Sequence, residues 1–538
     1  MHSTASSQVG YAYRSGSMSP AIPKNSKNLN QIECASSRPS WFQSTTVSPT
    51  VSPLMNLQNI KNDFCPILRQ PNSVLERPMQ TLRGGSGATI YIIRSIQKPL
   101  IQRGFLPEIK SQEINIARKC MPTNHTGLNA FMRDVEAGAC ENNSHFLQNN
   151  ELNELLKARR PRLLDCYSVT SPTLSLFVAD YPCVTDTDDK DRLLQASKPL
   201  SDYIMQGPLS VDTCVDHTLN LVKQLIQEQK IYGLQDIPLT DRKNVFLSSY
   251  GDRALSRWQI QSHFSIDASL IRSLKYVSKL SIDDTVYKNP VSFIEPIIDA
   301  LGSFSKGLIT HGDCQQSNNL LQRMGSENLY RNQRIDTRPL GINDSFMDVI
   351  KLLAGPAIIQ SVDRMHTHTI LMNEDFIQIN QHPKDEKHRL RLNRLETYHT
   401  QLDDYLIAGN GAEKIDLTDF NKFCQKIFQH VANNSQTQEN YAHLWLRLTT
   451  WVELACAGGF CFQGLQKSET IEEQLDFTNR TLTFVCAMAK ELPKIKMHLD
   501  SFLEMHKNDI SLNDGIKNQL LTLQNAVENI HFEIFPEQ

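Results

Sequence analysis

The sequence predicts an α+β fold, in which a small antiparallel β region precedes a large helical region. Short runs rich in β-branched and aromatic residues, bounded by glycine or polar turns, lie between residues 81 and 181, as expected of strands. After residue 212 apolar residues recur at a spacing near 3.6, and from about 355 to 535 the pattern is overwhelmingly helical.

The segment 1–77 is rich in Ser, Pro, Asn, Gln and Thr. Such a composition offers too little apolar surface to offset the entropy lost on ordering, so we expect a disordered segment or a tether. We expect a first ordered region over 78–185 and a second, helical region over 186–538.

The first ordered elements are predicted to be two strands joined by a glycine-rich turn within residues 81–94, which contain Gly84, Gly85, Ser86 and Gly87. Small residues at such a turn let backbone N–H groups approach phosphate oxygens closely. Because any hairpin can carry glycines, the turn alone indicates only a hairpin.

Residues 113–120 are predicted to form the third strand. Period-two geometry places Ala117 and Lys119 on one face and Arg118 on the other. A shift of one residue in register would exchange Lys119 and Arg118. An exposed Arg-Lys pair that ends an edge strand is the alternative without a function.

The next elements are a helix, a strand and a longer helix. Residues 129–141 have a helical pattern, 174–181 form an apolar run that ends in a polar turn, and 212–226 return to helical spacing. Residues 235–295 are an insertion of mixed helical segments, interpreted either as scaffold or as one wall of a substrate pocket.

Residues 308–321 are the most informative stretch, because a His-Gly-Asp sequence ends at Asp313 and Asn318 follows five residues later, between two apolar runs. This spacing suits phosphoryl transfer from ATP: the carboxylate can orient and deprotonate a hydroxyl, while the amide oxygen holds Mg²⁺. Asp336, eighteen residues after Asn318 at a strand end, is placed to supply a second metal ligand. Hard oxygen ligands are what Mg²⁺ prefers.

The order His-Gly-Asp-x4-Asn followed by Ile-Asp resembles the aminoglycoside phosphotransferase and choline kinase family, a small-molecule branch of the protein-kinase-like fold. Gly312 stands where protein kinases usually carry Arg. The runs 335–341 and 348–353 look like the IDPRG…YDxAKL pattern of bacterial phosphotransferase-like proteins. The resemblance covers about residues 80–355 by motifs.

The resemblance implies a two-lobed protein-kinase-like fold that uses ATP and Mg²⁺. It also implies that His311 braces the loop, that the strand 174–181 is a hinge beside adenine, and that Asp348 ties the metal loop to the helical lobe. The remaining site residues that it implies are the catalytic base Asp313, the metal ligands Asn318 and Asp336, the phosphate-binding Lys119, the phosphate-covering turn Gly84, Gly85, Ser86 and Gly87, and Glu136 (with Glu141 as alternative) as the partner of Lys119.

Two departures from the family pattern leave the acceptor open. Cys-Gln-Gln-Ser follows Asp313 where Leu-His-Pro-Gly is usual, and Thr337 follows Asp336 where Pro or an aromatic residue is commoner. Neither removes a group that contacts metal or acceptor. The expected acceptor is a hydroxyl of an amino alcohol, a sugar or an aminocyclitol. The alternatives are a kinase-like effector that acts on protein or lipid, and an inactive nucleotide-binding scaffold.

The composition excludes several other classes. The formal net charge of −3, from 55 basic and 58 acidic residues, argues against an electrostatic nucleic-acid binder. No apolar run is long enough to span a membrane, and the N-terminus lacks a secretory pattern. Twelve cysteines without a CxxC pair indicate reduced thiols, so we expect a cytoplasmic protein.

Overall fold

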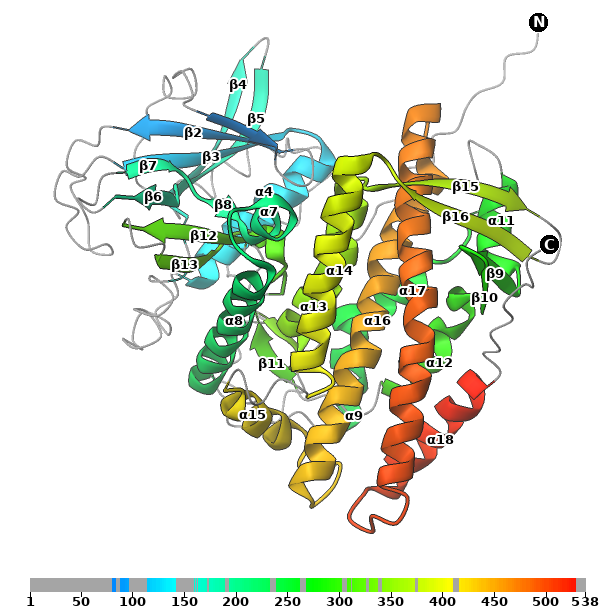
Figure 1. Cartoon of the computed structure of the whole chain (residues 1–538). Helices are drawn as coiled ribbons and strands as arrows, with labels where there is room; N and C mark the ends of the chain where they lie inside the picture. Colours follow the sequence, from blue (N-terminus) through cyan, green and yellow to red (C-terminus); the bar gives the residue numbers. More distant parts are fainter. Residues whose placement is uncertain are drawn as a thin grey trace, which may run out of the picture.

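The computed structural model (Figure 1) describes residues 80–83, 88–95, 114–141, 159, 161, 163–171, 174–188, 193–232, 239–261, 268–301, 307–310, 312–325, 329–336, 341–372, 376–409 and 416–528. The predicted segment 1–77 and the predicted phosphate-covering turn 84–87 lie outside these residues. In the described part a small antiparallel sheet precedes a larger helical region. The predicted two-lobed α+β class is therefore confirmed.

The first sheet is built from β1 (Gln80–Arg83), β2 (Thr89–Ser95), β3 (Ile114–Pro122), β4 (Asp165–Ser171) and β5 (Leu174–Pro182), with helix α4 (His125–Glu141) packed against it. All five strands are antiparallel, in the order β1-β2-β3-β5-β4. Phe131 of α4 stacks on Phe177 of β5 with ring centroids 5.2 Å apart, and Val135 is fully buried. This apolar contact with β5 fixes the rotation of α4 about its own axis. The rotation decides which acidic side chains of α4 face the neighbouring central strand β3.

A second, smaller sheet joins segments that are far apart in the sequence: β6 (Thr185–Thr187), β7 (Leu193–Ala196) and β8 (Lys198–Pro199) with β12 (Asn319–Met324) and β13 (Leu329–Arg334). Its order is β13-β12-β6-β7, and β8 also pairs with β12. The predicted boundary at residue 185 stays a prediction, since β6 begins three residues after β5 and already pairs with β12.

A two-stranded ladder positions the loop that carries Asp313. Strand β11 (Gly307–Thr310) pairs antiparallel with β14 (Gly341–Asp344). The short helix η6 (Gln316–Asn318) follows the loop, and helix α13 (Met347–Val362) begins soon after β14. In this register the loop starts after Thr310, at the Gly341 end of the ladder, and α13 begins after Asp344, at the opposite end.

The helical region comprises α7 (Leu200–Gln206), α8 (Val211–Tyr232), α9 (Leu239–Phe246), η4 (Leu247–Gly251), α10 (Asp252–Arg257), α11 (Ala268–Tyr276), η5 (Pro290–Phe293), α12 (Ile294–Leu301), α13, α14 (Glu386–Leu406), α15 (Thr418–Phe428), α16 (Ser435–Lys467), α17 (Ile471–Met505) and α18 (Asp514–Glu528). Helices α16 and α17 pack along one another (Figure 1). The Asn434 side chain caps α16, and Thr470 with Glu473 forms a capping box at the start of α17. Trp445 and Trp451 of α16 are almost completely buried, so α16 is a central helix of this core.

A β-hairpin interrupts the region that was predicted to be helical from about 355 to 535, so that prediction is wrong here. Strands β15 (His366–Met372) and β16 (Phe376–Pro383) join β9 (Lys279–Ile282) and β10 (Thr285–Lys288) in the order β10-β9-β16-β15. Exposure alternates along β15, and Ile377 and Ile379 of β16 are fully buried at a spacing of two. This period-two pattern indicates a strand, and nearby helical spacing obscured it.

Two further predictions from the sequence concern the cysteines and membrane-spanning helices. The nine cysteines whose side chains the structure describes are free thiols, as predicted. Among the helices that the structure describes, none combines the length and the apolar character needed to cross a membrane.

Candidate active site

The loop after β11 brings Asp313 and Asn318 together. Gly312 has a φ of +79°, a conformation that favours glycine, and the backbone then turns into η6. The Asn318 side chain donates from Nδ2 to the carbonyl oxygen of Asp313 at 3.0 Å. Because Nδ2 is occupied as a donor, Oδ1 is the amide atom that can bind a cation.

The β12–β13 hairpin brings Asp336 close to the loop that carries Asp313 and Asn318. Asn319 pairs with Arg334 in the ladder, and the Ile335 N–H donates to the Asn318 carbonyl at 2.9 Å. Asp336 follows with a φ of +56°, which is uncommon for a residue other than glycine and is found at functional sites. Its side chain is 45% exposed, so its carboxylate is accessible to a ligand.

Lys119 of β3 connects the first sheet to Asp336. Its Nζ lies 2.6 Å from Asp336 Oδ1 and 3.1 Å from Asp134 Oδ2. Burial disfavours the charge of Lys119, but the Asp134 and Asp336 carboxylates outweigh this effect and raise its pKa. Lys119 is therefore a fixed cation between the two parts of the molecule.

Arg118 has a separate role on the other face of β3. Its guanidinium donates from Nε and Nη2 to the two oxygens of Asp180 at 2.8 and 2.7 Å, and both side chains are buried. The register that places Lys119 toward Asp336 is thus the observed one. The alternatives, in which Arg118 takes this position or both residues face solvent, do not apply.

The helix acid that the structure brings to Lys119 is Asp134. The sequence interpretation chose Glu136, whose side chain lies outside the described part, with Glu141 as the alternative. Positions two apart on an α-helix differ by about 200° around its axis, so position 136 lies on another side of α4 from position 134. Asp134 is 4% exposed, and burial raises its pKa to about 6 against the opposing charge of Lys119.

Two hydrogen bonds with helix α13 stabilise the loop that carries Asp313. The Gly312 N–H donates to Asp348 Oδ1 at 2.8 Å, and Gln316 Nε2 donates to the Leu352 carbonyl at 2.6 Å. Asp348 thus contacts the loop that carries Asp313, whereas the sequence interpretation tied it to the metal loop. Positions 348 and 352 lie on one face of α13, and the loop packs against that face.

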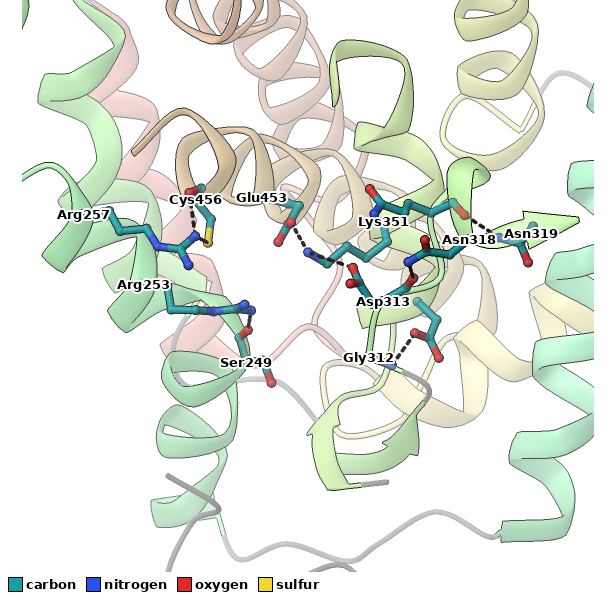
Figure 2. Close-up of polar contacts among 12 residues, drawn as sticks. Ser249, Arg253, Arg257, Gly312, Asp313, Asn318, Asn319, Lys351, Glu453 and Cys456 are labelled. Atoms are coloured by element: carbon teal, nitrogen blue, oxygen red, sulfur yellow. Dashed lines mark hydrogen bonds and ion pairs between the residues drawn. The ribbon is translucent and has the colours of Figure 1, made fainter. Parts of the chain in front are cut away.

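Figure 2 shows a buried ion pair beside Asp313. Lys351 of α13 contacts the Glu453 carboxylate of α16, and its Nζ is 4.0 Å from Asp313 Oδ1. Sequence reasoning missed both residues and Asp134. Lys351 lay inside the motif that supported the family resemblance, but Glu453 carries no sequence signal, since it comes from a helix about a hundred residues later.

Several predicted residues cannot be placed. His311, Gly84, Gly85, Ser86 and Gly87 lie outside the described residues, so their roles stay predictions. A cavity of about 270 Å³ exists elsewhere, around the far end of the β12–β13 hairpin. It contains none of the predicted site residues and is lined by Asp186, Gln195, Lys198, Asp202, Tyr203, Gln206, Gly207, Pro208, Arg323 and Tyr330.

The oxygen groups near the loop fit a magnesium ion. The Asp336 carboxylate is accessible, and the orientation of the Asn318 amide leaves its oxygen for a cation. In the part that the structure describes, no group of three or more His, Cys, Asp or Glu side chains could hold a metal. Mg²⁺ typically takes only one or two carboxylates and completes its shell with water and substrate phosphates, so this sparse set is adequate.

The solved structures to which this chain is similar include two kinases. A microcompartment-associated aminopropanol kinase has a TM-score of 0.33 and 10% identity, covering 78% of this chain and 93% of its own. Choline kinase from Cryptosporidium parvum Iowa II has a TM-score of 0.33 and 10% identity, covering 80% and 92%. No family model and no curated protein matches the chain. Both structures are kinases by name.

Proposed function

We propose that this protein is an ATP- and Mg²⁺-dependent phosphotransferase whose acceptor is a hydroxyl of a small molecule. The observation that supports this most is the contact of Lys119 with Asp336. Asp336 follows Ile335, whose N–H donates to the carbonyl of Asn318 in the loop that carries Asp313. Lys119 and Asp134 are largely buried, whereas the Asp336 carboxylate that Lys119 contacts is 45% exposed. A buried lysine held against an accessible carboxylate suits the binding of a nucleotide triphosphate.

Each side chain has a distinct part in this proposal. Lys119, held by Asp134, contacts phosphate oxygens, as a fixed ammonium does in kinase-like sites. Asn318 and Asp336 hold Mg²⁺, which would neutralise charge that develops on the phosphates. Asp313 accepts the proton of the acceptor hydroxyl as its oxygen forms the new bond to the γ-phosphorus and the bond to ADP breaks.

The acceptor class rests on the sequence. Gly312 replaces the arginine of protein kinases, which favours the small-molecule branch, and an amino alcohol, sugar or aminocyclitol is the proposed acceptor. In the insertion, η4 and α10 pack against α16, and Arg257 of α10 donates to the Cys456 carbonyl at 2.9 Å, so the insertion is suited to shape one side of the acceptor site.

An acceptor screen tests the proposal. Purified protein is incubated with Mg·ATP and ethanolamine, choline, 1-amino-2-propanol, galactose or kanamycin, and ADP release and phosphorylated product are both measured. We expect transfer to at least one acceptor class, and we expect Asp313→Ala to abolish it while Mg·ATP still raises the melting temperature.

Other outcomes separate the alternatives. Labelled phosphate that appears only on protein or lipid of a cell lysate would favour the effector alternative. Binding of Mg·ATP without turnover would favour the scaffold. Wild-type turnover by Asp313→Ala would refute the assignment of the base.

A further inference from the structure

A buried lysine lies behind the carboxylate that is proposed to act as base. We propose that Lys351, held in place by Glu453, is a positioning residue for Asp313. This inference rests on the proposed function, because it concerns the orientation of the Asp313 carboxylate during transfer.

The three charged groups form a chain that leads into the core. Lys351 Nζ is 4.0 Å from Asp313 Oδ1 and in direct contact with Glu453 Oε1. The exposed fraction of the side chain falls from 18% for Asp313 to 8% for Lys351 and 3% for Glu453. Asp313, the most exposed of the three side chains, is thus the one that meets the acceptor. Glu453, the most buried, holds Lys351 in place.

The backbone of α13 places Lys351 with little freedom. Asp348, Lys351, Leu352 and Gly355 have the spacing i, i+3, i+4 and i+7, which is one face of a helix. Asp348 binds the Gly312 N–H, the Leu352 carbonyl binds Gln316, and Gly355 lies against the Gln316 side chain. Lys351 sits between these contacts, so its ammonium is directed at the one loop residue between Gly312 and Gln316 that carries a charge.

The described residues that follow Asp313 in the loop provide no cation. The residues that follow Asp313 are Cys, Gln, Gln and Ser, all of them neutral. Helix α13 therefore delivers the positive charge from outside the loop. An ammonium 4.0 Å from Oδ1 favours one orientation of the Asp313 carboxylate, the one in which it accepts the proton of the hydroxyl.

A purely structural role is the competing explanation, because Lys351 also neutralises Glu453 in the core. Glu453 is 2% exposed, and its Oε2 has no hydrogen-bond partner in the described part of the chain. An isolated buried carboxylate would destabilise the fold strongly. The test must therefore also include a variant in which Glu453 is neutralised when Lys351 is replaced.

The experiment compares Lys351→Met, Lys351→Arg and the double variant Lys351→Met/Glu453→Gln. Stability is measured by urea unfolding, Mg·ATP binding by thermal shift, and kcat and KM with whichever of the five panel acceptors the wild type uses fastest. Arg447→Met is the matched control, since Arg447 lies in α16, the helix that carries Glu453, and forms an ion pair with Asp403 of α14 at 2.7 Å without contacting the loop.

We expect Lys351→Met to lose stability and about 100-fold in kcat, with little change in KM, as for a misplaced catalytic group. The double variant regains the urea midpoint but not kcat, and Lys351→Arg regains part of kcat. Arg447→Met should lose stability without a change in kcat.

Recovery of kcat together with stability in the double variant would overturn the inference and leave Lys351 a purely structural role. Unchanged kcat in Lys351→Met would do the same. Absence of transfer by the wild type would instead refute the proposed function, and the inference with it.

Discussion

Gly355 offers a direct test of how α13 supports the catalytic loop. A Cβ atom at this position would lie 1.6 Å from Gln316 Oε1 and 2.5 Å from its Cδ. Gln316 is fully buried and donates to the Leu352 carbonyl and to the Tyr398 hydroxyl at 2.6 and 3.2 Å. The substitution Gly355→Ala must therefore displace the Gln316 side chain and break both hydrogen bonds.

The magnitude follows from three effects. Overpacking costs about 1–3 kcal/mol, and a displaced buried amide costs about 1–3 kcal/mol more. Alanine is a better helix former than glycine by about 1 kcal/mol, which offsets part of the loss. We therefore expect Gly355→Ala to lower the free energy of unfolding by about 2–4 kcal/mol.

Urea unfolding of a double-mutant cycle measures this. Gln316→Ala removes the side chain that blocks the new methyl group, so Gly355→Ala/Gln316→Ala should be more stable than Gly355→Ala alone. Gly515→Ala of α18 is the control, because its Cβ would meet only Asn513 Oδ1, at 3.1 Å. If Gly355→Ala is as stable as the wild type, or if the double variant is no better than Gly355→Ala, the reasoning about this contact is refuted.

Three further outcomes are expected. Asp134→Asn should weaken Mg·ATP binding roughly 10- to 150-fold by titration calorimetry, since the loss of a charged hydrogen bond costs about 1.5–3 kcal/mol; unchanged affinity would contradict the role of Asp134. Glu228→Gln should lower the free energy of unfolding in urea by about 3–5 kcal/mol, because it leaves Arg334, which is 1% exposed, without its buried partner; a loss below 1 kcal/mol would count against this. Burial lowers the pKa of His443 from 6.5 to about 4, so the unfolded chain binds a proton more readily and stability falls as pH drops through that window. His443→Leu should remove up to about 3 kcal/mol of this fall in urea melts, and an unchanged pH dependence would contradict it.

Local patterns predicted much of the first sheet. Strands β1, β2, β3 and β5 overlap the predicted segments 81–94, 113–120 and 174–181, because alternation and turn residues act over a few positions. The same period of two placed Lys119 and Arg118 on opposite faces, and the observed partners agree. The strands β15 and β16 were missed, since their alternation is short and stands between strong helical patterns.

The partners of the candidate site were harder to predict. The choice between Asp134 and Glu136 depends on the rotation of α4 about its axis relative to β3, which the packing of Phe131 on Phe177 sets and no local pattern encodes. Glu453 meets Lys351 only because α13 and α16 pack together. Such contacts between distant segments follow from the whole core, so a motif that names Asp313, Asn318 and Asp336 cannot include them.

A crystal structure with Mn²⁺ and a non-hydrolysable ATP analogue tests the central claim most directly, because Mn²⁺ gives an anomalous signal and accepts the oxygen ligands that suit Mg²⁺. We predict one anomalous peak bound by the Asn318 amide oxygen and the Asp336 carboxylate, with Lys119 on a phosphate. A metal peak remote from both side chains, or a nucleotide bound away from Lys119, would contradict the proposed site.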